Sequence, residues 1–392
     1  MPELVALDLP AGRGFVDALR AVWDTGDAAA PLDPRLPAPA AQALLAALAP
    51  TRVVGVDGSI NRLSGGRAVE SGDALVVATS GSSGTPRGVV LTHAAVAASA
   101  AATSDRLGVD PQRHRWLACL PLAHVGGLSV VTRSVLTGTP LTVIPDFDAQ
   151  EVERIGRTGE ATHVSLVPTA LGRLDPTAFV SILLGGAAPP GGLPPNVVTT
   201  YGMTETGSGV VYDGHPLDGV EVAIGTGGAG TDAPGEILVR GPMLLRAYRD
   251  GTDPRVRGPD GTDGWLPTGD GGRLVDGVLE VDGRLAEVVV TGGEKVWPSA
   301  VEKVLASHPA VAEVTVWKRP DAEWGERVVA WVVPADPASP PTLAELAELA
   351  ASELAPWAAP KELELVTALP RTPSGKVRRR ALASRERDER GP

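Results

Sequence analysis

Short apolar runs that alternate with helix-like stretches across residues 116–240 constrain the fold more than any other feature of the sequence. The runs at 116–120, 141–144, 164–167, 182–184, 197–198 and 236–239 have the length of buried strands. Strands and helices that alternate in this way typically build a largely parallel sheet flanked by helices. We therefore expect an α/β fold in a large N-terminal domain, residues 1–283. Before residue 70 we expect one short helix, at 40–48.

The pattern changes after about residue 283. Two capping-box sequences, Ser299 with Glu302 and Thr342 with Glu345, are typical of helix starts. Strand-like runs occupy 313–316, 328–333 and 363–366. These features predict a small C-terminal α+β domain over residues 284–392.

Charge and cysteine content narrow the class of protein. The 392 residues include 35 basic and 47 acidic side chains, a formal net charge of −12. Nucleic acids and anionic membranes select basic surfaces, so neither is expected as a partner. The one cysteine, Cys119, permits no intramolecular disulfide, and we see no signal peptide or membrane helix. We expect a cytoplasmic protein.

A polar, glycine-rich loop follows the apolar run 74–78. Glycines let backbone N–H groups turn toward an anion, hydroxyls add donors, and Arg87 adds positive charge. It is not a Walker loop, because Gly-Lys-Ser/Thr is missing and 89–91 continues as a strand. A flexible Ser/Gly loop is the alternative. The predicted phosphate contacts are Thr79, Ser80, Gly81, Ser82, Ser83, Gly84, Thr85 and Arg87.

A second candidate motif is the pentapeptide 201–205, Tyr-Gly-Met-Thr-Glu. It follows a predicted strand, where ligand sites of parallel sheets lie. Thr204 can donate to a phosphate, and the Glu205 carboxylate can bind Mg²⁺. A helix start with an acidic first turn is the alternative interpretation.

Asp270 and Arg284 lie in a third motif, Trp-Leu-Pro-Thr-Gly-Asp at 265–270 with Gly-Arg at 283–284. A carboxylate can accept both hydroxyls of a ribose. A turn aspartate is the alternative.

Lys376 belongs to the fourth motif, Arg-Thr-Pro-Ser-Gly-Lys at 371–376. A lysine on a glycine-containing loop can neutralise developing negative charge. An inert exposed lysine is the alternative.

Together, in this order, the four motifs resemble those of the acyl-adenylate-forming superfamily of acyl-CoA synthetases, adenylation domains and luciferases. The resemblance spans about residues 74–382, and includes Pro-Leu-Ala-His at 121–124 and Leu-Gly-Gly-Ala at 184–187. It implies an acid–thiol ligase that uses ATP, Mg²⁺ and CoA, with a small mobile C-terminal domain.

The resemblance assigns a role to each matched residue. Loop 79–88 would bind the ATP phosphates, Thr204 the α-phosphate, Glu205 Mg²⁺, and Asp270 and Arg284 the ribose. The remaining nucleotide contacts would be Gly186, Ala187, Tyr201 and Gly202. Lys376 would bridge the substrate carboxylate and the α-phosphate. Gly292 and Gly293 would approach CoA, and Glu287 would be the hinge.

Three departures accompany the resemblance. Arg87 stands where the superfamily usually has lysine, and Glu287 where it usually has aspartate. The chain before the phosphate loop is also shorter than in most members, so part of the N-terminal subdomain is missing or reduced.

This shortness and the strings at 124–135 and 200–220 resemble the compact actinobacterial o-succinylbenzoate–CoA ligases of menaquinone biosynthesis. Their acid carries two carboxylates, and we expect Arg133 to pair with the one that is not activated. An internal salt bridge to Asp or Glu is the alternative. The resemblance makes His124 a gate between the acyl and nucleotide sites, while its apolar neighbours also fit a core histidine.

Other functions stay open at this point. They are a CoA ligase for another aryl or fatty acid, an adenylation enzyme that loads a carrier protein, and a non-catalytic nucleotide-binding protein. Monomer and homodimer are both open.

Overall fold

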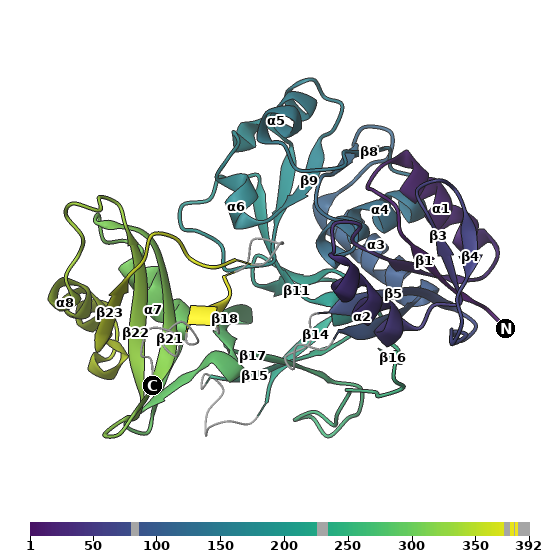
Figure 1. The fold of residues 1–392 in the computed structure, drawn as a ribbon. Helices are drawn as coiled ribbons and strands as arrows, with labels where there is room; N and C mark the ends of the chain where they lie inside the picture. Colours follow the sequence, from purple (N-terminus) through teal and green to yellow (C-terminus); the bar gives the residue numbers. More distant parts are fainter. Residues whose placement is uncertain (80–85, 226–233, 372–376, 380, 383–392) are drawn as a thin grey trace. The chain divides into compact units, whose positions relative to one another are not determined.

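A computed structural model describes residues 1–79, 86–225, 234–371, 377–379 and 381–382 (Figure 1). The chain forms two compact units, one of residues 1–223 and 238–266 and one of residues 224–237 and 267–392. In the described ranges, no helix is long and apolar enough to cross a bilayer.

The N-terminal part of the first unit is a seven-stranded sheet in the order β16-β6-β5-β2-β1-β3-β4. Strands β3, β1, β2 and β5 run parallel, while β4, β6 and β16 are antiparallel to their neighbours. The strands are β1 (Leu4–Leu7), β2 (Ala28–Pro31), β3 (Arg52–Val54), β4 (Ile60–Arg62), β5 (Asp73–Thr79), β6 (Arg87–Thr92) and β16 (Ala247–Tyr248).

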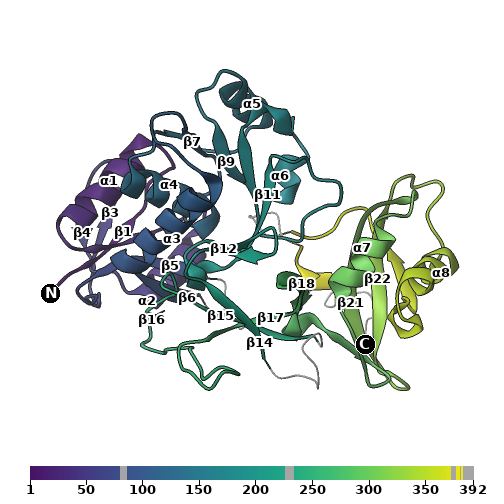
Figure 2. The same cartoon turned by 180° about the vertical axis from the view of Figure 1, so that it is seen from behind.

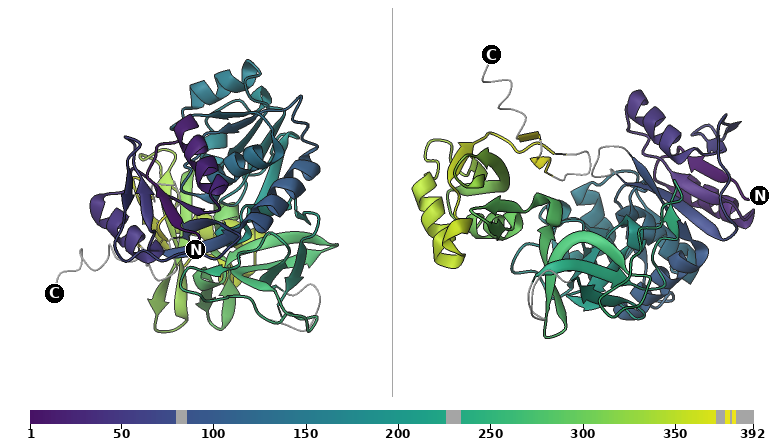
Figure 3. Two further views of the ribbon diagram at one scale, coloured as in Figure 1. Left: turned by 90° about the vertical axis from the view of Figure 1, so that its right-hand side faces the viewer. Right: turned by 90° about the horizontal axis from the view of Figure 1, so that it is seen from below.

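Helices α1 (Arg13–Asp24) and α2 (Ala38–Leu48) belong to this part, near the N-terminus in Figure 3. Helix α1 buries Phe15, Val16, Leu19 and Val22 on one face. That spacing is typical of an amphipathic helix packed on a sheet.

A second seven-stranded sheet has the order β13-β12-β11-β10-β9-β7-β8, parallel from β8 to β11 and antiparallel beyond. Its strands are β7 (Trp116–Ala118), β8 (Leu141–Val143), β9 (His163–Leu166), β10 (Ser181–Leu184), β11 (Val197–Gly202), β12 (Gly209–Tyr212) and β13 (His215–Pro216). Its helices are α5 (Ala149–Arg157) and the short α6 (Pro168–Leu171). Helices α3 (His93–Leu107) and α4 (Val125–Thr137) pack side by side in the same unit (Figure 2).

A four-stranded sheet has the order β14-β15-β17-β18. Its strands are β14 (Glu221–Ile224), β15 (Gly235–Arg240), β17 (Leu266–Val275) and β18 (Val278–Arg284).

The remaining sheet, in the second unit, has the order β20-β19-β22-β21, with β23 beside β22. Its elements are β19 (Val289–Thr291), β20 (Glu294–Val296), β21 (Val311–Asp321), β22 (Gly325–Pro334), β23 (Glu362–Leu365), α7 (Pro298–Leu305) and α8 (Leu343–Glu353).

Strand β22 is buried on both faces. Val328, Ala330 and Val332 pack with residues of α7 and α8. The alternate residues Val329 and Trp331 pack instead with Trp317, Leu369 and Leu382. Because successive side chains of a strand point to opposite faces, both sides of this sheet carry a core.

The structure confirms the α/β class and the predicted strands of residues 116–240. The capping box at Thr342 is confirmed, because its side chain accepts from the Glu345 N–H and Glu345 returns the bond. The capping box at Ser299 is wrong. Helix α7 begins after Trp297 without a side-chain cap, since Ser299 donates to the Asp282 carbonyl and Glu302 accepts from Val316 N. The boundary at 283/284 stays a prediction.

Candidate active site

The predicted phosphate loop joins two adjacent antiparallel strands. Thr79 ends β5, Arg87 begins β6, and the two residues are paired in register. Ser80, Gly81, Ser82, Ser83, Gly84 and Thr85 lie outside the described residues, so their predicted contacts stay predictions. The strand predicted at 89–91 is part of β6.

Three segments of predicted site residues lie at, or directly after, the carboxyl ends of parallel strands in the second sheet. His124 follows β7, Gly186 and Ala187 follow β10, and Tyr201 and Gly202 end β11. The carboxyl ends of parallel strands share one edge of a sheet, where α/β proteins bind ligands. Gly186 has φ +81°, a conformation that favours glycine, and exposes its backbone at that edge.

Thr204 and Glu205 lie in a three-residue 3-10 helix, η2 (Thr204–Thr206), directly after β11. The Thr206 hydroxyl fixes the turn by accepting from Met203 N at 2.9 Å. Glu205 is partly buried, and its Oε1 accepts from the Tyr248 hydroxyl at 3.0 Å. A single carboxylate suits Mg²⁺, which binds proteins through one or two carboxylates and takes its other ligands from water and phosphates. The described residues contain no cluster of three or more His, Cys, Asp or Glu that could hold a metal without substrate.

Arg87 lies beside the same tyrosine. Its guanidinium carbon is 3.7 Å from the Tyr248 ring centroid, and Nη2 is 3.2 Å from Asp250 Oδ2. Burial, and then the nearby Glu205 carboxylate, raise the pKa of the Tyr248 hydroxyl to about 12. The hydroxyl therefore stays protonated, as a hydrogen-bond donor, throughout the neutral range.

His124 is the N-cap residue of α4, and its side chain is exposed. It makes no side-chain cap hydrogen bond to that helix. The exposure argues against the core-histidine interpretation and keeps the side chain accessible at the strand edge described above.

Arg133 lies on α4 and is 2% exposed. Its Nε and Nη1 have no hydrogen-bond partner in the part of the chain that the structure describes, so the alternative salt bridge is not formed at these atoms. Burial is the main cause that lowers the pKa of the guanidinium. Arg133 also lines a small pocket with Val96, Leu128 and Gly207, the last of which directly follows η2.

Asp270 and Arg284 are brought together in the second unit. They are paired in register on β17 and β18, and Arg284 Nε is 2.9 Å from Asp270 Oδ1. Asp270 is 6% exposed, whereas the Arg284 side chain is 54% exposed. This pair fixes the carboxylate in place beside an open guanidinium.

The other predicted residues of the second unit are placed as follows. Lys376 lies outside the described residues, while Arg371 and Val377 on either side of its segment are paired as an antiparallel bridge. Glu287 ends the 3-10 helix η3 (Leu285–Glu287), and its Oε2 is 2.7 Å from Arg379 Nη1. Gly292 and Gly293 form the exposed turn between β19 and β20, with φ +59° and +87°.

Sequence reasoning missed Tyr248, Asp250 and Trp116. Tyr248 and Asp250 belong to none of the four motifs described above. The register of β16 on β6 brings them to Arg87. Trp116 looked like an ordinary strand residue, but its ring lies under the Arg133 guanidinium.

Comparisons with known proteins agree with this arrangement. The AMP-binding enzyme family model matches residues 67–249, and the AMP-binding enzyme C-terminal domain model matches 300–376. A probable 2-succinylbenzoate–CoA ligase of Mycobacterium tuberculosis is 39% identical over 82% of this chain and 86% of its own length.

Solved structures are also similar. An o-succinylbenzoate CoA synthetase from Bacillus subtilis, in complex with its acyl-adenylate intermediate, has a TM-score of 0.83 and 29% identity, and the match covers 97% of this chain and 88% of that one. The same enzyme with ATP and magnesium has a TM-score of 0.82 and 28% identity over 97% and 89% of the two chains. These matches confirm the predicted resemblance: the chain belongs to the AMP-binding, acyl-adenylate-forming enzymes.

Proposed function

We propose that this protein is an o-succinylbenzoate–CoA ligase of menaquinone biosynthesis, an AMP-forming acid–thiol ligase. The observation that carries the choice of acid is the buried Arg133, which lines a small pocket and whose Nε and Nη1 have no hydrogen-bond partner among the described residues. An unpaired buried guanidinium costs several kcal/mol, on the order of the penalty for any uncompensated buried charge, so the site favours an anionic ligand. The curated relative named above has the same activity in its name.

The reaction has two steps. A carboxylate oxygen of the acid bonds to the α-phosphorus of ATP, and the bond to pyrophosphate breaks. The CoA sulfur then bonds to the acyl carbon, AMP leaves, and the thiol loses its proton. No protein nucleophile is required.

Several residues would act in the first step. Arg133 would hold the free carboxylate of the acid, Thr204 would donate to the α-phosphate, and Lys376 would neutralise charge as it develops on the phosphoryl oxygens. Glu205 would hold Mg²⁺, which supplies electrostatic stabilisation of the phosphates when bound. Asp270 would accept from the ribose hydroxyls.

The second step would use other residues. The small domain would turn at Glu287, and Gly292 and Gly293 would let the pantetheine arm of CoA approach the backbone closely. His124 would separate the acyl and nucleotide sites until then. We also propose that the enzyme acts in the cytoplasm, as a monomer or homodimer.

The test is CoA-thioester formation with ATP and Mg²⁺ over a panel of o-succinylbenzoate, benzoate, salicylate and octanoate, with product masses measured directly. We expect a thioester with o-succinylbenzoate alone. Turnover of another acid, with none of o-succinylbenzoate, would retain the reaction and reject the menaquinone assignment. No acid-dependent pyrophosphate release with any acid would indicate a nucleotide-binding protein.

A further inference from the structure

Tyr248 links two segments of the first unit that are distant in sequence. Its strand β16 pairs with β6 through Tyr248 and Val89. Three residues earlier, Leu245 N donates to the Glu205 carbonyl at 2.8 Å. The backbone therefore fixes the tyrosine relative to both Arg87 and η2.

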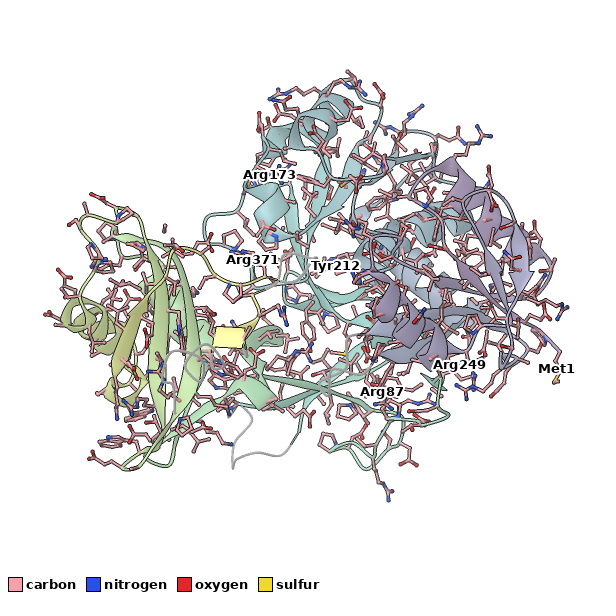
Figure 4. The ribbon with its side chains drawn as sticks, in the orientation of Figure 1. Met1, Arg87, Arg173, Tyr212, Arg249 and Arg371 are labelled. Atoms are coloured by element: carbon pink, nitrogen blue, oxygen red, sulfur yellow. The ribbon has the colours of Figure 1, made fainter. Side chains whose placement is uncertain are left out.

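The Tyr248 side chain completes the link. Its hydroxyl donates to Glu205 Oε1 at 3.0 Å, and the Arg87 guanidinium covers its ring at 3.7 Å. Asp250 Oδ2 pairs with Arg87 Nη2 at 3.2 Å. Arginine can stack flat on the ring and pair with a carboxylate at once, which a lysine ammonium cannot do in the same way. Figure 4 labels Arg87 and also Arg249, which follows Tyr248 in the chain and whose N–H donates to the Gly88 carbonyl at 2.7 Å.

We propose that Tyr248 is a positioning residue for the metal ligand Glu205, with Arg87 holding the tyrosine ring in place. This rests on the proposed role of Glu205 in binding Mg²⁺. By occupying Oε1, the hydroxyl orients the carboxylate and presents Oε2 to the cation. Carboxylate ligands are commonly held by such hydrogen bonds, whose loss lowers metal affinity about 10–100-fold.

The experiment measures Mg²⁺ dependence in Tyr248→Phe, which removes the hydroxyl and keeps the ring for Arg87. Binding of a fluorescent ATP analogue is titrated with Mg²⁺, and adenylation rates are measured over the same range. We expect the half-saturating Mg²⁺ concentration to rise about 10-fold in both assays. Nucleotide affinity in EDTA and the KM for the acid should stay unchanged.

Tyr212→Phe is the matched control. It removes the same hydroxyl from a buried tyrosine that bonds Thr103 Oγ1 at 3.1 Å instead of Glu205. We expect no change in its Mg²⁺ dependence. An equal shift in both variants would assign the effect to general loss of packing and overturn the proposal. Thermal unfolding of each variant establishes that it is folded.

Glu205→Gln separates this inference from the proposed function. If Glu205→Gln raises the Mg²⁺ requirement and Tyr248→Phe does not, the positioning role is rejected and the metal ligand stands. If Glu205→Gln titrates with Mg²⁺ like the wild type, the metal assignment itself is rejected. In the double variant we expect little change beyond Glu205→Gln alone, because residues that act through one another are not additive.

Discussion

The guanidinium of Arg133 lies over the indole of Trp116, with the Arg133 Cζ 4.7 Å from the ring centroid. Both side chains are fully buried, and Trp116 Nε1, like Arg133 Nε and Nη1, has no hydrogen-bond partner within the described ranges. Cation–π contacts of desolvated groups contribute about 2 kcal/mol. The contact holds the charge in place without satisfying its N–H groups, which leaves them available to a carboxylate.

Replacing Arg133 should therefore weaken binding of the acid without lowering the stability of the fold. Arg133→Met keeps most of the side-chain volume and removes a buried charge. We expect the KM for the acid to rise about 10–100-fold, the value of a hydrogen bond to a charged group, while the KM for ATP stays unchanged. The melting temperature should stay equal or rise, because apolar substitutes for buried charges are often neutral or stabilising.

Arg249→Met is the control for this prediction. Arg249 belongs to the first unit and is only partly buried, and it donates to the carbonyls of Leu48 and Ala68, each at 2.9 Å. Its loss leaves carbonyls unpaired, so the melting temperature should fall with no specific effect on the acid KM. Unchanged acid kinetics in Arg133→Met would reject its role in acid binding.

Lys376→Ala should affect one half-reaction. Removing a group that stabilises transition-state charge typically costs about 10²–10³ in rate, so we expect that loss in adenylation. Thioester formation from supplied acyl-AMP should be largely retained. Arg378→Ala, a basic residue two positions later, serves as the control, and equal losses in both steps of Lys376→Ala would contradict the assignment.

Asp270→Asn should weaken ATP binding, because a neutral amide accepts ribose hydroxyls less well than a carboxylate. We expect the KM for ATP to rise about 10-fold, at the lower end of the value for charged hydrogen bonds. Asp282→Asn is the matched control, since Asp282 pairs with Arg273 across the same two strands at 3.4 Å. A similar change in both variants would indicate a role in the sheet and not in nucleotide binding.

The buried His163 should make stability depend on pH. Its ring lies 4.8 Å from His114 and 5.1 Å from Trp116, and burial, followed by His114 and Arg133, lowers its pKa to about 4. Between pH 6.5 and about 4 the unfolded chain binds a proton that the folded chain does not. The stability from this group is therefore complete above pH 6.5 and is lost progressively as the pH falls to 4, by at most about 3 kcal/mol.

The measurement is the thermal unfolding midpoint of wild type and His163→Phe at pH 7.5 and 5.0. Between pH 7.5 and 5.0, the unfolding midpoint of the wild type should fall by more than that of the variant. Identical pH dependence in the two proteins would show that His163 does not titrate in this way.

The sequence predicts elements best where strong apolar runs lie between polar turns. The runs at 182–184 and 328–333 became β10 and β22 nearly at their expected bounds. The N-terminal region was largely missed: besides the expected helix at 40–48, it contains α1 and strands as short as β3. Strands of three or four residues carry little periodicity, and their pairing with distant β5 cannot be read locally.

The same limit applies to the site. Motifs identified the candidate residues that follow β10 and β11, because chain order alone places them at one sheet edge. Contacts that depend on the register of distant strands, such as Tyr248 with Glu205, left no local signal. The false capping box at Ser299 failed for the same reason, since Glu302 is engaged by Arg379 and by β21, both remote in sequence.

The core on the second face of β22 includes residues on either side of the segment that carries Lys376, the proposed catalytic lysine. Leu369 and Leu382, which bracket that segment in the chain, are 6% and 1% exposed beside Trp317 and Trp331. A nonsense mutation or a proteolytic cut before residue 369 would expose Trp317 and Trp331 and so create an apolar patch that promotes aggregation. A truncation that removes Lys376 would thus produce a chain that aggregates and is degraded. A point mutation of Lys376 would instead leave a folded, inactive protein that competes with the active enzyme for substrate.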